Sequence, residues 1–134
     1  MFNIERISIH SDRDILLARQ RGRAAGESVG FVATDLTLIA TAISELARNI
    51  VSYARRGEIE LRTVVEDNRR GLVIVARDDG PGIADLERAM LDGYSTSGGL
   101  GLGLPGVRRL MDSFEIASRA GQGTTVQAAK WMRG

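Results

Sequence analysis

Residues 34–51 read TDLTLIATAISELARNIV, and the fold of the chain depends on this stretch. Apolar side chains recur in it at three- and four-residue steps, the spacing that gives a helix one apolar face. We expect a helix that begins after a cap at Thr34 and ends near Gly57. Glu45 and Asn49 lie one turn apart, so they project from the same side of that helix. An asparagine inside a helix costs about half a kcal/mol relative to alanine, which suggests that the polar pair has a purpose.

The patterns on either side of this helix predict a sheet. Alternating Ile7 and Ile9 indicate an opening strand, and Ser11 with Asp14 three residues later indicates the start of a helix that ends near Gly26 or Gly30. Downstream we expect two hairpins, 58–65 with 71–76 and 114–118 with 124–129. Between them we expect a turn at 79–82, a short helix through 86–90, a loop at 92–99 and a helix opened by Pro105.

Together these elements predict an α+β fold, a two-layer α/β sandwich whose mixed, mostly antiparallel sheet carries helices on one face. With 134 residues, 43% of them hydrophobic, the chain has apolar material for one core, so we expect a single domain over residues 1–134. It has no apolar run of about eighteen residues, which predicts a cytoplasmic protein without membrane partners.

Composition excludes several kinds of chemistry. The chain has no cysteine and one histidine, His10, so thiolate nucleophiles and Cys/His metal sites are ruled out. Its formal charge of +1 and scattered aromatic residues argue against a nucleic-acid partner. Lys130 is the single lysine and follows no glycine loop, which excludes a Walker A site and a eukaryotic-type kinase site. Gly101, Gly103 and Gly106 spell G-x-G-x-x-G but follow a polar loop rather than a strand, so we reject a dinucleotide site.

Three glycine-rich segments remain. Asp78-Asp79-Gly80-Pro81-Gly82 ends a strand, and by itself it could be an ordinary strand-to-helix turn. Residues 98–104 read GGLGLGL, and alternating glycines expose backbone N–H groups to phosphate at a helix start. Residues 121–126 read GQGTTV, which alone is an ordinary hairpin turn; Thr124 shares the strand parity of Val126, so we prefer it to its neighbour Thr125.

In order and spacing, Glu45–Asn49 and these three segments resemble the four boxes of the GHKL (Bergerat-fold) superfamily of ATPases and kinases. The resemblance implies ATP and Mg²⁺ as cofactors. It implies Glu45 as the catalytic general base, Asn49 as the metal ligand and Asp78 as the acceptor for the adenine amino group. The other implied nucleotide contacts are the glycines of the two glycine boxes and a hydroxyl that reaches the adenine: Gly80, Gly82, Gly99, Gly101, Gly103 and Thr124.

Within the superfamily, the short chain looks most like the bacterial partner-switching serine kinases, and among these the stressosome kinases. That likeness implies transfer of the ATP γ-phosphate to a serine of a STAS-domain protein and alternate binding of a PP2C-type phosphatase. A homodimer stays open. The alternatives are an anti-sigma factor that sequesters a sigma subunit and a non-catalytic, nucleotide-gated adaptor.

One residue departs from the family pattern. Many relatives have a basic residue three positions after the asparagine, where this chain has Ser52. The phosphate charge would then be met by Mg²⁺, by backbone or by an arginine such as Arg48 or Arg55. We also expect residues 94–99 to form a short lid ordered by the γ-phosphate.

Overall fold

The computed structural model describes residues 3–54, 56–81, 103–119 and 121–133. Along the chain they form a strand, two α-helices, a π-helical turn, a strand pair, a third α-helix and a second strand pair. Their bounds are β1 Asn3–Ile9, α1 Asp12–Val29, α2 Ala33–Asn49, η1 Ile50–Ala54, β2 Gly57–Glu66, β3 Arg69–Asp78, α4 Gly103–Leu110, β4 Ser113–Ser118 and β5 Thr124–Trp131. The short helix through 86–90 and the lid at 94–99 lie outside the described residues.

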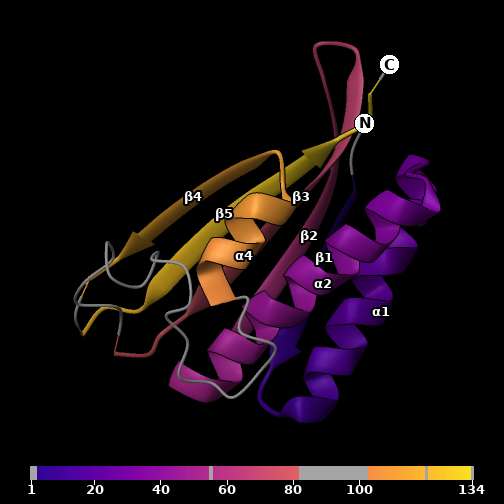
Figure 1. Ribbon diagram of the computed structural model, residues 1–134. Helices are drawn as coiled ribbons and strands as arrows, with labels where there is room; N and C mark the ends of the chain where they lie inside the picture. Colours follow the sequence, from indigo (N-terminus) through magenta and orange to yellow (C-terminus); the bar gives the residue numbers. More distant parts are fainter. Residues whose placement is uncertain (1–2, 55, 82–102, 120, 134) are drawn as a thin grey trace.

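The strands form one five-stranded sheet in the order β1-β2-β3-β5-β4. Figure 1 shows α1, α2 and α4 together on one face of it. The expected α+β, two-layer sandwich is confirmed, and the sheet is antiparallel at every pairing of the described strands. Both predicted hairpins are present, and Asp67 and Asn68 make the first turn with positive φ angles of 52° and 64°. Asparagine and aspartate tolerate this left-handed conformation better than most residues.

Strand alternation assigns each side chain to a face of the sheet. Ile59 and Leu61 of β2 are 0% and 2% exposed and belong to the main core between sheet and helices. Glu58 and Glu60 alternate with them and therefore lie on the other face. There, Val73, Val75 and Ala129 form a second, smaller apolar cluster with Trp131 packed against it. The helix-covered face thus holds most of the core.

The start and end of α1 follow the predicted signals. Asp14 Oδ2 accepts hydrogen bonds from the backbone N–H groups of His10 at 2.8 Å and Ser11 at 3.2 Å, which satisfies two donors at the helix start. The helix ends at Gly30, whose φ of 111° is left-handed. Gly26, the alternative end, is instead buried inside the helix, where a Cβ would come within 2.8 Å of the Leu36 side chain.

The expected cap of the long helix was wrong, and its helical path toward Gly57 changes geometry on the way. Thr34 is not its cap: the N-cap is Val32, which has an extended backbone and cannot cap through its side chain. Phe31 beside it is only 5% exposed, so tertiary packing rather than a polar cap determines where α2 begins. At the other end, α-helical geometry stops at Asn49 and the chain continues as the π-helical turn η1. Such turns are rare and occur often at functional sites.

Candidate functional site

Four chain segments meet at one end of the molecule. Figure 1 shows that the end of α2, the first turn of α4, the end of β3 and the start of β5 lie at the end opposite to the start of β1. Asp78 closes β3 and Thr124 opens β5, so both predicted adenine contacts fall at this end. Gly103 begins α4 with a φ of 52°, a left-handed angle that favours glycine.

Asp78 and Thr124 are direct partners across the β3–β5 pair. Their strand parity matches that of Ala76 and Val126, both in the main core, so the two side chains lie on the helix-covered face. Asp78 Oδ1 accepts the Gly80 N–H at 2.9 Å, which orients the carboxylate. The Thr124 hydroxyl lies 2.7 Å from the Ser118 hydroxyl on β4. The sheet therefore presents an acceptor and a hydroxyl side by side.

Glycines allow the backbone to crowd around Asp78. A Cβ on Gly123, whose φ is 81°, would stand 2.1 Å from the Asp78 carbonyl oxygen. On the other side, Gly57 pairs with Asp78 in the sheet, and a Cβ there would stand 2.2 Å from the Arg77 carbonyl oxygen. Neither contact is possible for a real side chain, so both positions require glycine. The sequence had identified Gly57 only as the end of a helix.

The π-helical turn joins the helix half of the site to the sheet half. Ile50, its first residue, is 2% exposed, and its Cγ2 would lie 3.0 Å from a Cβ on Gly57. Ala54, its last residue, lies against Gly80, where an added Cβ would come within 2.6 Å of the Ala54 Cβ. Asn49 directly precedes this turn. The packing of η1 on both glycines thus fixes the end of α2, and with it Asn49, relative to Asp78.

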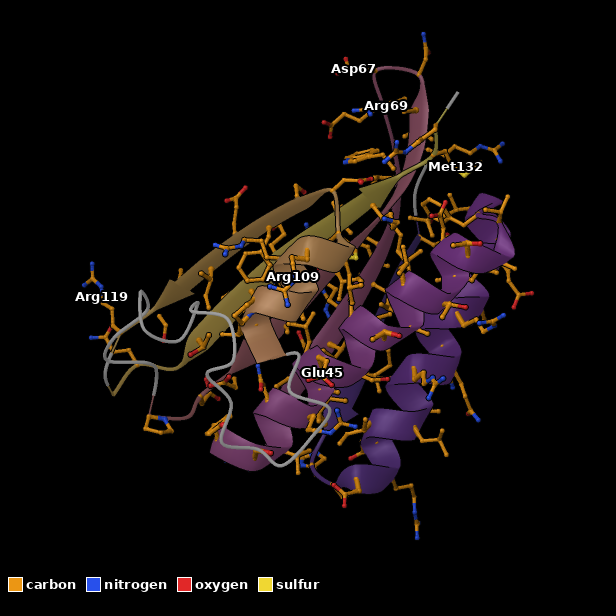
Figure 2. The ribbon with its side chains drawn as sticks, in the orientation of Figure 1. Glu45, Asp67, Arg69, Arg109, Arg119 and Met132 are labelled. Atoms are coloured by element: carbon orange, nitrogen blue, oxygen red, sulfur yellow. The ribbon has the colours of Figure 1, made fainter. Side chains whose placement is uncertain are left out.

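Glu45 is 3% exposed, which is unusual for a carboxylate on a helix. Arg48 Nη1 donates a hydrogen bond of 2.6 Å to Glu45 Oε1. Figure 2 labels Glu45 on α2, near the lower end of α4 in that view. Glu45 thus pairs with Arg48, and its carboxylate lies in the interior rather than on a solvated helix face.

The strongest charge cluster lies elsewhere, on the face of the sheet opposite the helices. Glu60 is 1% exposed and accepts hydrogen bonds from Arg6, Arg62 and Arg77. Burial raises the pKa of Glu60, but hydrogen bonds and charge from Arg62 and Arg77 outweigh it, so the pKa lies below the ordinary 4.5. This cluster stabilises β1–β2–β3 and is separate from the site around Asp78.

The structure brings together some predicted site residues and leaves others undescribed. Asp78, Gly80 and Thr124 form one group, while Glu45 and Asn49 occupy the end of α2 that η1 connects to it. Gly82, Gly99 and Gly101 lie outside the described residues, as does Arg55. Sequence reasoning missed three contributors that touch this group: Gly57, Ala54 and Ser118.

The donor set suits a magnesium ion that is held mainly by its nucleotide. The described part of the chain contains no group of three or more His, Cys, Asp or Glu residues that could hold a metal. Mg²⁺ keeps several waters and is commonly bound through one or two protein oxygens plus substrate phosphates rather than by a protein cage. The amide oxygen of Asn49 fits that single role.

This fold and site define an ATP-binding domain of the GHKL class. The family model "Histidine kinase-, DNA gyrase B-, and HSP90-like ATPase" matches residues 34–132, and the chain belongs to this family. It is similar to the serine/threonine-protein kinase RsbT of Bacillus subtilis, with 53% identity over 95% of this chain and 96% of that protein.

One further relative supports the family assignment, and one solved structure shares the fold. An anti-sigma F factor of Caldanaerobacter subterraneus is 32% identical over 73% of this chain and 71% of its own length. The histidine kinase domain of a blue-light activated kinase from Erythrobacter litoralis shares the fold, with a TM-score of 0.54 and 19% identity. The match covers 89% of this chain and 59% of that one, and it bears on the fold alone.

The family and the likeness to RsbT give the enzyme class, an ATP-dependent serine/threonine protein kinase. Among the described helices, none is long and apolar enough to cross a membrane.

Proposed function

We propose that residues 1–134 form one cytoplasmic kinase domain that transfers the γ-phosphate of ATP to a serine of a STAS-domain protein. In a partner-switching system of this kind, the kinase alternates between that substrate and a PP2C-type phosphatase. The proposal rests on the likeness to RsbT, which spans nearly the whole of both chains. The structural observation that carries it is the placement of Asp78 beside Thr124, joined through η1 to the helix that bears Glu45 and Asn49.

The chain's own residues have distinct roles in the proposed reaction. Asp78 accepts a hydrogen bond from the adenine amino group, and the Gly80 N–H holds the carboxylate in place. Glu45 accepts the proton of the serine hydroxyl as that oxygen bonds to the γ-phosphorus and the bond to the β–γ bridging oxygen breaks, releasing ADP. Asn49 supplies an oxygen ligand to Mg²⁺, which neutralises phosphate charge when bound.

The remaining implied contacts complete the proposed nucleotide site. The glycines of the second box, Gly99, Gly101 and Gly103, are assigned to the triphosphate, and Gly82 to the turn beside the base. A glycine in the left-handed conformation at the start of α4 is consistent with backbone N–H groups facing phosphate there. The Thr124 hydroxyl is assigned to the adenine, directly or through water.

An anti-sigma function is the second candidate, favoured by the relatives named anti-sigma F factor. The two functions predict different complexes. A partner-switching kinase should co-purify with STAS and phosphatase proteins, whereas an anti-sigma factor should co-purify with a sigma subunit.

The test is incubation of the chain with Mg-ATP and recombinant STAS-domain proteins of its own organism, followed by mass spectrometry for phosphoserine. We expect one STAS protein to gain a single phosphate, and Glu45→Gln to abolish the gain while retaining nucleotide affinity. Asp78→Asn should weaken ATP binding by about 10-fold or more. With the amide oxygen bonded to the Gly80 N–H, the side-chain NH2 group would face the adenine amino group, and two hydrogen-bond donors cannot pair. Asp79→Asn, at an exposed neighbour, is the matched control. Phosphate transfer by Glu45→Gln at the parent rate would reject the mechanism.

A further inference from the structure

Among the described residues, two arginine–glutamate pairs lie within single helices, and they differ in a way that bears on catalysis. On α1, Arg23 Nε lies 3.9 Å from Glu27 Oε1, with side chains 46% and 62% exposed. On α2, Arg48 Nη1 lies 2.6 Å from Glu45 Oε1, with side chains 33% and 4% exposed. The first is an ordinary solvated pair. The second joins a partly exposed guanidinium to a buried carboxylate.

Burial changes what such a contact does. An exposed helix pair contributes little to stability, and its loss leaves both groups in water. A buried carboxylate without a partner instead loses its solvation, and it responds by taking up a proton. The proposed role of Glu45 requires that it be ionised before the acceptor hydroxyl arrives. Arg48 supplies the buried carboxyl with a charged hydrogen-bond partner.

The hydrogen bond from Arg48 also fixes the orientation of the Glu45 carboxyl. Arg48 Nη1 binds Oε1, and a carboxylate has a second oxygen with its own lone pairs. Because Arg48 stands in the last turn of α2, its charge is also favoured by the helix dipole. A guanidinium held at 2.6 Å therefore prevents the Glu45 carboxyl from rotating freely, and Oε2 is left to accept the proton.

From this geometry we propose that Arg48 is a positioning residue that holds the buried Glu45 carboxyl and aims Oε2 at the acceptor hydroxyl, rather than a ligand of the ATP phosphates. The proposal rests on the proposed kinase function. In the transfer step the hydroxyl proton passes to Oε2, the serine oxygen bonds to the γ-phosphorus, and ADP departs. Arg48 makes no bond to any of these atoms.

The test compares Arg48→Met, Arg48→Lys, Glu45→Gln and the double variant Arg48→Met/Glu45→Gln. The matched control is Arg23→Met, which removes an arginine from the solvated pair on α1. Two quantities are measured for each: kcat for phosphorylation of the STAS protein found above, and Kd for a fluorescent ATP analogue with Mg²⁺. Thermal unfolding of each variant reports whether it is folded.

We expect Arg48→Met to lower kcat by about 10- to 100-fold, at or below the lower end of the roughly 100- to 10,000-fold that a positioned general base contributes, because Glu45 itself remains. Its Kd for nucleotide should stay within about twofold of the parent, because the proposed role involves no phosphate contact. Arg48→Lys should recover most of the rate, since an ammonium retains the charge. The double variant should be no slower than Glu45→Gln alone, because Arg48 acts only through Glu45.

Other results would overturn the proposal. A raised Kd with unchanged kcat would make Arg48 a phosphate ligand, and equal losses in Arg48→Lys and Arg48→Met with matching losses of thermal stability would make its role structural. An additive double variant would show that Arg48 acts independently of Glu45. Full activity of Glu45→Gln would remove Glu45 as the base and with it this proposal. Absence of phosphoserine on every STAS protein incubated with the parent chain would instead reject the proposed function itself, so the two failures are distinguishable.

Discussion

Gly121 and Gly123 form a matched pair of sites for testing how tightly the β4–β5 turn packs on Asp78. Both have left-handed backbones, with φ angles of 80° and 81°. A Cβ on Gly121 would meet nothing within 4 Å, whereas a Cβ on Gly123 would stand 2.1 Å from the Asp78 carbonyl oxygen. Substitution by alanine therefore adds the same backbone strain at both sites and a steric clash at only one.

The expected losses of stability follow from the backbone strain and the steric clash. A left-handed backbone costs a residue with a Cβ about 1–2 kcal/mol, so Gly121→Ala should lower the free energy of unfolding by about that amount. An ordinary contact to a Cβ is 3.4–4 Å, so in Gly123→Ala the backbone must move by more than 1 Å. Forced shifts of this kind cost about 1–3 kcal/mol more. For a domain of this size, each kcal/mol lowers Tm by about 3–5 °C.

The displaced group is the backbone of Asp78, the proposed adenine-binding residue, so the clash should also weaken nucleotide binding. We expect Gly123→Ala to melt below Gly121→Ala by about 3–15 °C and to bind a fluorescent ATP analogue at least about 5-fold more weakly. Gly121→Ala should bind it as the parent does. Calorimetry and fluorescence titration measure the two effects. Equal melting temperatures together with equal affinities would refute the reasoning.

Three further predictions concern stability. Glu60→Gln should lower the free energy of unfolding by about 1–3 kcal/mol, against less than about 1 kcal/mol for the more exposed Glu58→Gln, because it removes the buried carboxylate that three arginines share and leaves two of them only Glu58. Because the folded-state pKa of Glu60 is lowered, this difference should be full at pH 7 and shrink as the pH falls below 4.5; a difference independent of pH in urea titrations would contradict it. Lys130→Met should destabilise by about 1–3 kcal/mol, since Lys130 Nζ donates to the Leu110 carbonyl at the end of α4 at 3.0 Å; an unchanged Tm would show that this bond contributes nothing. Asp14→Ala should cost about 1 kcal/mol through the lost bonds at the start of α1, and equal urea midpoints would argue against it.

Local patterns predicted much of this fold because each depends on neighbours in the chain. Alternation gave the strands of both hairpins, and three- to four-residue spacing gave α2. Gly30, one of the two glycines near which α1 was expected to end, has a left-handed backbone angle that favours glycine. Strand parity, which depends only on counting residues, favoured Thr124 over Thr125 on β5, whereas Asp78 on β3 was implied by the resemblance to the family.

Other features depended on contacts between distant segments. Val32 rather than Thr34 precedes α2 because Phe31 is buried in the core, and no local sequence pattern indicates that burial. The sequence showed Glu45 and Arg48 three residues apart, a spacing that is common on solvated helices. Only the structure shows that the Glu45 carboxylate is buried and held by Arg48. The requirement for glycine at Gly57 likewise arises from the strand beside it. The sequence alone is sufficient where the repeat of a helix or strand determines which way a side chain points. Burial and close approach arise only when segments that are distant in the sequence pack together.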